Sequence, residues 1–148
     1  MKKLLKVFAL LAALVMLVTL TACTKDAEND SQNAAETSVW DNAWYTEDTT
    51  LGEGTMQIQV EVKAEDKSIT FTINTDAQTL GDALLTHSLI EGESSQFGMY
   101  VKSVNQIRAD YDLDGYYWAV YKDGGYLETG VDSTVIADGD HYELVREK

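Results

Sequence analysis

Residues 55–64 alternate strictly between apolar and polar side chains, and this pattern restricts the possible fold more than any other feature of the chain. Side chains on a β-strand point alternately to the two faces of a sheet, so a repeat of two predicts a strand with one buried face. The apolar positions are Met56, Ile58, Val60 and Val62. A second alternating run follows the polar turn 65–68 and contains Ile69, Phe71 and Ile73. We therefore expect the two runs to pair as a β-hairpin.

A short helix is expected after this hairpin. Thr79 and Asp82 have the spacing of a capping box, in which the Thr hydroxyl accepts from the third helical amide and the acid reaches back to the cap amide. Apolar residues then recur three to four positions apart, and Gly92 ends the segment after Leu89 and Ile90. The pattern predicts a helix of about two to three turns.

Strand patterns return after the helix, over residues 97–104, 116–121 and 141–145. Asp123-Gly124 is a strong hairpin-turn signal, and residues 138–140 form a second turn before the last strand. Two strands, one helix and several further strands predict a small α+β domain. We expect one mostly antiparallel sheet with one short helix packed on it.

The amino terminus has a different composition from the rest of the chain. An uncharged apolar run of 14 residues, Val7 to Leu20, follows three Lys and is too short for a bilayer span of about 20 residues. Residues 20–23 resemble the lipobox of bacterial lipoproteins, and they end in Cys23, the one Cys of the chain. We expect residues 1–22 to be a lipoprotein signal peptide and Cys23 to be lipidated. An ordinary signal peptide cleaved near Ala22, or an uncleaved anchor, is the alternative.

Residues 23–38 are polar and contain no aromatic and no β-branched aliphatic side chain, so they cannot bury enough surface to fold. They are expected to be a disordered tether, with a folded domain over residues 39–148 that begins at Trp40. Two acyl chains on Cys23 would hold the protein stably on a membrane. The expected location is therefore the outer face of a bacterial cell membrane, with the bilayer as a partner through Cys23.

The charge of residues 24–148 excludes several classes of function. This part holds 8 basic and 25 acidic side chains, a formal net charge of −17. Such a chain cannot replace the counterions of a nucleic acid, and it has no polybasic surface for anionic lipid. A single Cys excludes a disulfide framework or a Cys-based zinc site. No nucleophile motif and no acid–base pair stands out, so we expect no enzyme and no required cofactor.

Residues 110–115 spell the first half of an EF-hand calcium loop, with carboxylates at alternate positions and a Gly at the bend. The twelfth position, where a bidentate Glu is expected, is Tyr121, and a strand rather than a helix follows. These departures favour a solvated acidic turn. A weak metal site remains the alternative, with three candidate ligands: Asp110, Asp112 and Asp114.

The aromatic strand 116–121 is a candidate ligand surface. By alternation Tyr117, Ala119 and Tyr121 share one face, where a small Ala between two Tyr could form a shelf for a flat ligand. Trp118 and Val120 share the other face, and for Trp118 a place in the core is favoured. For the Tyr face, ligand binding and simple cover of the sheet remain equally open.

Residues 44–146 resemble the transcobalamin-like C-terminal domain, found in bacterial surface lipoproteins and as the β-domain of animal cobalamin carriers. The similar pieces keep the family's order and spacing: residues 43–54, 79–84, 97–105, 117–118, 129–131 and 138–140. The resemblance implies a β-grasp-like fold. One departure is Asn105-Gln106, where the family usually has Asn-Gly. Because a type I′ turn would place Gln106 at positive φ, we expect a wider turn or another turn type there.

The resemblance also implies a function. In the animal carriers this domain covers one face of the corrin, and a helical barrel absent here holds the other. We therefore expect half of a cobalamin or corrinoid site, completed by an importer component or a second protein. The implied contact segments are 96–100, 117–118 and 126–128. With the Tyr face, the candidate ligand-binding residues are Phe97, Gly98, Tyr100, Tyr117, Trp118, Tyr121, Tyr126 and Leu127. A surface adhesion or protein-interaction module without a small ligand is the alternative function.

Overall fold

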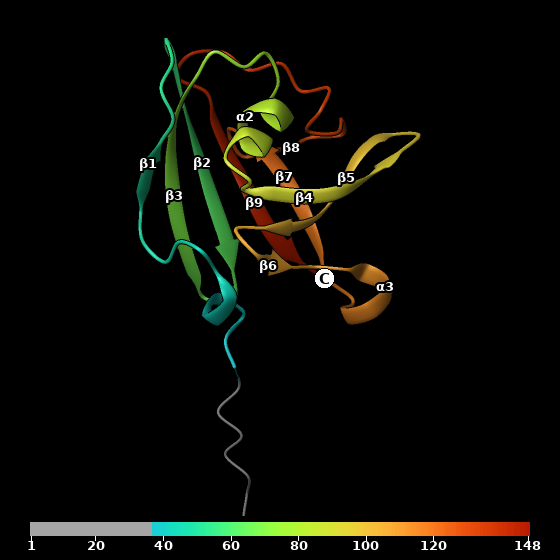
Figure 1. Ribbon diagram of the computed structural model, residues 1–148. Helices are drawn as coiled ribbons and strands as arrows, with labels where there is room; N and C mark the ends of the chain where they lie inside the picture. Colours follow the sequence, from blue (N-terminus) through green and yellow to red (C-terminus); the bar gives the residue numbers. More distant parts are fainter. Residues whose placement is uncertain (1–36) are drawn as a thin grey trace, which may run out of the picture. The chain divides into compact units, whose positions relative to one another are not determined.

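The computed structural model describes residues 37–148, and β-strands are its main elements (Figure 1). Three short helical segments accompany them: η1 (Val39–Asn42), α2 (Leu80–Thr86) and α3 (Tyr111–Asp114). The strands are β1 (Thr49–Leu51), β2 (Met56–Ala64), β3 (Lys67–Thr75), β4 (Ile90–Ser95), β5 (Gly98–Val104), β6 (Ile107–Arg108), β7 (Tyr117–Lys122), β8 (Gly125–Tyr126) and β9 (His141–Glu147).

The strands form two sheets. The larger one has six strands in the order β1-β3-β2-β9-β7-β8, and the smaller one has three in the order β4-β5-β6. The expected hairpin of β2 and β3 is confirmed, with Ala64 opposite Lys67 across a two-residue turn. At the centre of the larger sheet β2 pairs with β9 in parallel. The smaller sheet and α2 lie over the same face of the larger sheet (Figure 1).

The expectation of an α+β, β-grasp-like domain with a single sheet is wrong, because the described part is a β-rich sandwich of two sheets. The reason lies in β4, whose sequence IEGESS has one buried side chain, Ile90, and no alternation. It pairs with β5 across a register shift between Glu91 and Gly92. This pairing places β5 and β6 in a second layer instead of extending the first sheet.

The helix α2 has seven residues, about two turns, so its predicted length is met at the lower end, and it ends well before Gly92. Its cap is confirmed on the Thr side, because the Thr79 hydroxyl accepts from the Asp82 amide at 3.1 Å. The helix ends at Thr86, and Ser88 adopts a left-handed φ of 54°. That conformation turns the chain and lets the Leu89 amide donate to the Leu84 carbonyl at 2.9 Å. Leu89 and Ile90 then enter the core from the second layer.

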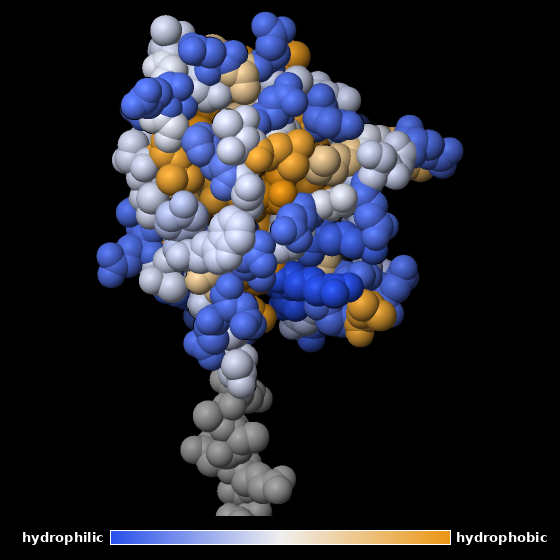
Figure 2. Space-filling model, in the orientation of Figure 1, coloured by the Kyte–Doolittle hydropathy of each residue, from blue (hydrophilic) through white to orange (hydrophobic). Residues whose placement is uncertain are grey.

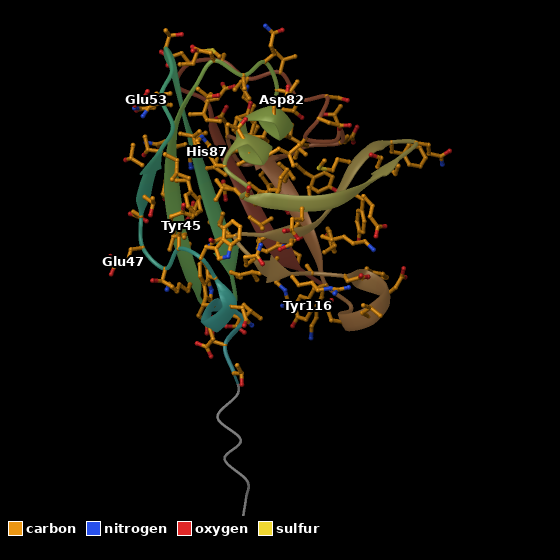
Figure 3. The ribbon with its side chains drawn as sticks, in the orientation of Figure 1. Tyr45, Glu47, Glu53, Asp82, His87 and Tyr116 are labelled. Atoms are coloured by element: carbon orange, nitrogen blue, oxygen red, sulfur yellow. The ribbon has the colours of Figure 1, made fainter. Side chains whose placement is uncertain are left out.

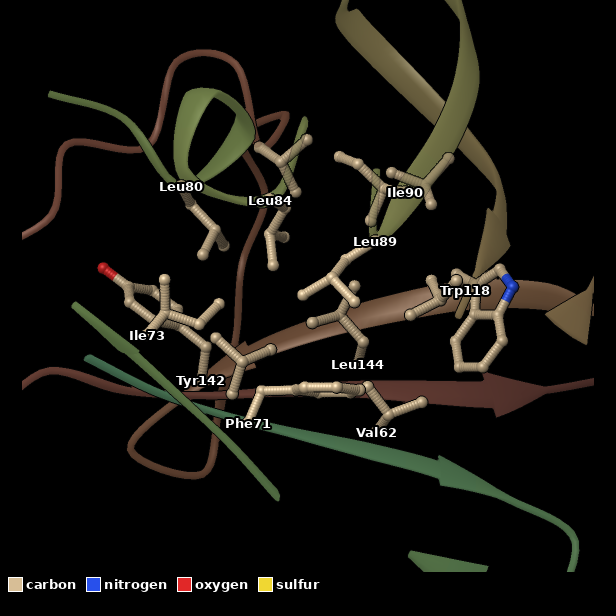
Figure 4. Packing of buried hydrophobic residues seen from close by; sticks show 14 of the residues in the cluster. Val62, Phe71, Ile73, Leu80, Leu84, Leu89, Ile90, Trp118, Tyr142 and Leu144 are labelled. Carbon is tan, nitrogen blue, oxygen red and sulfur yellow. The ribbon is translucent and has the colours of Figure 1, made fainter. Parts of the chain in front are cut away.

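The core lies between the two layers (Figure 4). The larger sheet contributes Phe71, Ile73 and Leu144, and Leu80 and Leu84 of α2 pack against them. Tyr142 is also fully buried, and its hydroxyl donates to Asp140 Oδ2 at 2.8 Å. Burial, together with this carboxylate acceptor, raises the pKa of Tyr142 above its ordinary value. A buried tyrosine of this kind stays neutral and keeps its hydrogen bond.

The segment before β1 is packed onto the sheet. The Trp40 indole is buried and donates to the Ala64 carbonyl at 2.9 Å, and the Tyr45 ring meets Phe71 edge-on at 5.4 Å. Ser38 Oγ donates to Glu65 Oε2 at 2.7 Å. The expected signal peptide, Cys23 and nearly all of the tether lie outside the described residues. Within residues 37–148, no helix has the length and apolar character needed to cross a bilayer.

The turn at Asn105-Gln106 differs from the expectation. Val104 pairs with Ile107, so the turn has two residues, and both have positive φ, 51° for Asn105 and 64° for Gln106. These are the angles of a type I′ turn, so the expectation of a wider or different turn is wrong. The Asn105 side chain is buried and holds Tyr45, accepting from its amide at 3.0 Å and donating to its carbonyl at 2.8 Å. This tertiary clamp fixes the turn despite the strain at Gln106.

Replacing Gln106 by Gly should stabilise the protein by about 0.5–1 kcal/mol, because Gly adopts positive φ without the Cβ penalty. Urea unfolding of the full chain would measure the change. Gln106→Ala keeps the strain and is the matched control, with an expected change near zero. A loss of stability in Gln106→Gly would contradict the strain assigned to this residue.

Candidate functional site

A hollow of about 160 Å³ lies where β5 meets β7 and β8, and it is called the β5–β7 hollow below. It is lined by Met99, Tyr100, Val101, Trp118, Val120, Tyr126, Leu127, Glu128, Thr129, Gly130 and Val131. The structure therefore brings β5 against two neighbouring segments that follow later in the chain, residues 118–120 and 126–131. Each of the three contact segments implied by the family resemblance contributes to the lining.

Trp118 forms the fixed part of this hollow. Its side chain extends from the larger sheet to the smaller one, where Nε1 donates to the Ile107 carbonyl at 3.2 Å. Only 6% of the residue is exposed, so most of the ring is core and an edge borders the hollow. Because the indole N–H has a partner, the ring is held in one orientation.

Two glycines bring the start of β5 against the loop after β8. A Cβ on Gly98, whose φ is +104°, would lie 2.6 Å from Asp132 Oδ1, and one on Gly130 would lie 3.2 Å from the Gly98 Cα. Side chains at either position would separate the two segments. The glycines thus allow the close backbone approach that closes one end of the hollow.

The loop wall of the hollow is tied to the start of α2. The Gly81 amide donates to the Val131 carbonyl at 2.8 Å, and the Leu80 amide donates to the Thr134 carbonyl at 2.8 Å. Within the loop, Thr134 Oγ1 donates to the Gly130 carbonyl at 3.0 Å. The wall is therefore formed before any ligand arrives.

The aromatic residues expected at the site lie around the hollow more than in it. Tyr100 shares its face of β5 with Lys102, whose Nζ lies 5.7 Å from the Tyr100 ring centroid. By alternation Met99 and Val101 point to the opposite face. Phe97 is 82% exposed at the end of the projecting β4–β5 hairpin and is not among the lining residues (Figure 1). Met99 and Val101 thus face the hollow beside Trp118, while Glu128, Thr129 and backbone groups make its exposed surface more polar than apolar.

Tyr117 and Tyr121 lie on the other face of β7 from Trp118. Both hydroxyls donate to Glu147, at 3.2 Å from Tyr117 and 2.8 Å from Tyr121. This carboxylate acceptor raises the pKa of Tyr121 to about 12 and also raises the pKa of Tyr117. Ala119 between them is 1% exposed, so the expected shelf offers a flat ligand no accessible surface between the two Tyr rings. The candidate residues are divided between two faces of the sheet.

The aspartate loop has carboxylates that already face cations. Asp110 Oδ2 accepts from Arg108 at 3.0 Å and from Lys102 at 3.3 Å, and the Arg108 bond is the main reason that its pKa lies below the ordinary range. Asp114 Oδ2 accepts from Arg146 at 3.1 Å. Within the described residues, no group of three or more His, Cys, Asp or Glu side chains is placed to hold a metal ion.

Two other hollows are open and polar. One of about 420 Å³ lies over the smaller sheet, where Glu93 faces Lys102 at 3.3 Å and Gln106 donates to Glu91 at 3.3 Å. The other, about 380 Å³, is lined by Gly52, Glu53, Asn74, Thr75, Asp76, Ala77, Asp82, Thr86 and His87 (Figure 3). Charged or hydrogen-bonding residues are the majority in both linings.

Val101, Val120 and residues 129–131 also line the hollow, although they were not predicted as ligand contacts. Val101 and Val120 carried no signal beyond strand alternation. Residues 129–131 belonged to a piece that resembles the family, and this was the one available sign that the loop approaches β5.

Replacing Gly98 by Ala should destabilise the protein by about 3 kcal/mol, because the new Cβ would meet both positive φ and the Asp132 carboxylate. Gly124→Ala is the matched control: its φ is +79°, but a Cβ there would have nothing within 4 Å. It should cost about 1 kcal/mol. Urea unfolding would compare the two variants, and equal losses would show that the close approach to the 128–132 loop does not matter.

A crystallised protein from Ruminococcus gnavus, proposed to bind metal, is 32% identical to this chain with a TM-score of 0.60. The alignment covers 64% of this chain and 98% of that one. Haptocorrin in complex with Cbi (cobinamide) is 18% identical with a TM-score of 0.48, over 66% of this chain and 26% of haptocorrin. A likeness that distant says nothing about the ligand of this chain. Among curated proteins, none matches.

The family model described as "Domain of unknown function (DUF4430)" matches residues 77–143, which run from the turn before α2 into β9 and include every lining residue of the β5–β7 hollow. The identity to the Ruminococcus gnavus protein extends over nearly all of that protein. This chain therefore belongs to the same protein family as the Ruminococcus gnavus protein.

Proposed function

We propose that residues 39–148 form a binding module for a small, flat, partly apolar ligand, and that a cobalamin or related corrinoid is that ligand. The observation that carries the proposal is the β5–β7 hollow, which gathers Met99, Trp118 and Leu127 from separate segments. The corrinoid as ligand class comes from the resemblance to the transcobalamin-like domain. Apolar walls with a few polar groups are typical of sites for such ligands.

The small volume of the hollow supports a site that covers only part of the ligand. Pockets that enclose a drug-sized ligand measure about 300–1,000 Å³, whereas this one holds about 160 Å³. A ring of corrin size would lie across the hollow and place one edge or one side chain in it. The exposed Phe97, at the end of the β4–β5 hairpin, would then extend the contact. The other face of the ligand would be covered by a second protein, such as an importer component.

Other functions have weaker support. The Ruminococcus gnavus protein is proposed to bind metal, but the Asp110 and Asp114 carboxylates of this chain are directed at Arg and Lys side chains. The exposed aromatic residues would also suit a protein-interaction module, which remains the second candidate. We propose a binding role and no catalytic activity, since the hollow contains no nucleophile placed beside a general base.

We also propose that the protein is exported and lipid-anchored through Cys23 on the outer face of a bacterial membrane. This proposal rests on the sequence of residues 1–23 alone. The face in Figure 2 is mostly hydrophilic, with a hydrophobic area between α2 and the β4–β5 hairpin and smaller ones elsewhere, as near α3. Such a surface suits a domain held in water beside a membrane.

Titration of the full chain, purified in detergent, with cobinamide should quench its Trp fluorescence, to which Trp118 contributes, and raise the melting temperature. Binding to the native state at about 100 times Kd adds about 2.7 kcal/mol to stability. Met99→Ala and Leu127→Ala should each weaken binding several-fold without unfolding the protein, because both side chains line the hollow and are only partly buried. Tyr117→Phe, on the other face of β7, is the matched control and should bind normally.

Two outcomes would contradict the proposal for the site. The absence of any spectral change and of any thermal shift at high micromolar ligand would reject corrinoid binding. Weaker binding in Tyr117→Phe with normal binding in Met99→Ala would move the site to the opposite face of the larger sheet.

Replacing Cys23 by Ser should leave the protein unprocessed or release it into the medium, because no residue would carry the acyl chains. Cell fractionation with immunoblotting would measure the distribution. Thr24→Ser is the control and should remain in the membrane fraction. A processed Cys23→Ser protein that stays on the membrane would contradict lipid anchoring.

A further inference from the structure

The β5–β7 hollow has an unbalanced charge. Glu128 is the one charged residue among its lining residues, and no Lys or Arg is included. Asp132 borders the same place, since its Oδ1 lies 2.6 Å from the ideal Cβ positions of both Gly98 and Gly130. Glu128 therefore lines the hollow, and the Asp132 carboxylate lies beside the two glycines next to it.

The Lys side chains on the neighbouring strands already form ion pairs with carboxylates. Lys102 Nζ lies 3.3 Å from Glu93 Oε2 and 3.3 Å from Asp110 Oδ2, so two carboxylates oppose one ammonium. Lys122, at the end of β7, lies 2.7 Å from Asp140 Oδ2. Either ammonium would have to give up its ion pair with a buried or partly buried carboxylate, Asp110 or Asp140, before it could turn to a ligand. The hollow thus presents a negative field with no cation available to balance an anionic ligand.

We propose that the β5–β7 hollow selects its ligand by charge: it accepts a ring that presents uncharged amides or a cation, and it rejects the same ring bearing carboxylates. This inference rests on the proposed function and narrows it. Two like charges a few ångströms apart repel more strongly beside a protein wall than in bulk water. Amide groups instead meet the Glu128 carboxylate as hydrogen-bond donors. Discrimination of this kind comes from the repulsion of the wrong partner as much as from attraction of the right one.

The test compares two ligands with one ring. Cobinamide carries amides and no phosphate, and cobyrinic acid carries carboxylates on the same corrin. Titration of the full chain in detergent at about 20 mM salt should give at least about tenfold weaker binding of cobyrinic acid. The difference should shrink at about 0.5 M salt, where exposed charges are screened within a few ångströms.

Variants of the acidic residue make the test specific. Glu128→Gln should improve cobyrinic acid binding and leave cobinamide within about twofold, and Glu128→Lys should narrow the difference further. Glu53→Gln, at the separate 380 Å³ hollow, is the matched control and should change neither affinity. Equal binding of the two rings at low salt, or no effect of Glu128→Gln, would overturn the charge selection while the proposed function stands. Failure of both rings to bind would overturn the proposed function and this inference with it.

Discussion

The contact between Trp118 and the Ile107 carbonyl joins the two layers of the molecule, and the arrangement of the site depends on it. An indole buried between two sheets fills more space than an aliphatic side chain, so it sets how far β5 can approach β7. The approach is closest where Gly98 meets Gly130 and is open beside Trp118. The hollow is therefore the space between the Trp118 ring and the point where the backbone of Gly98 meets that of Gly130.

Much of the larger sheet could be predicted from the sequence, because β2, β3 and β9 each bury one face and expose the other. The Asp123-Gly124 turn was equally clear, and both residues have the expected positive φ. The second sheet could not be predicted. Its strand β4 lies at an edge and buries Ile90 alone, so it lacks the alternation that reveals a strand and depends on pairing with β5.

The segments that line the site could be predicted from the sequence, but the sheet faces that border it could not. Alternation places Trp118 and Tyr117 on opposite faces of β7, but only the position of the second sheet decides which face borders a hollow. The turn at Asn105-Gln106 shows the same limit. Local preference argues against a Gln at positive φ, yet the hydrogen bonds between Asn105 and Tyr45, 60 residues apart, hold that conformation. Contacts between distant segments outweighed local propensity in both places.

The affinity that so small a hollow can reach depends on how far its walls are already ordered. Its loop wall is tied to α2 through the Val131 and Thr134 carbonyls, so a ligand would not have to order that wall on binding. The entropy cost of association falls accordingly, and a limited contact area can still give measurable affinity. The same limited area keeps residence times short, since affinity differences lie mostly in dissociation rates. A rigid, shallow and negatively charged surface therefore suits brief capture of an uncharged or cationic ring, with the rest of the ring's surface free to meet a second protein.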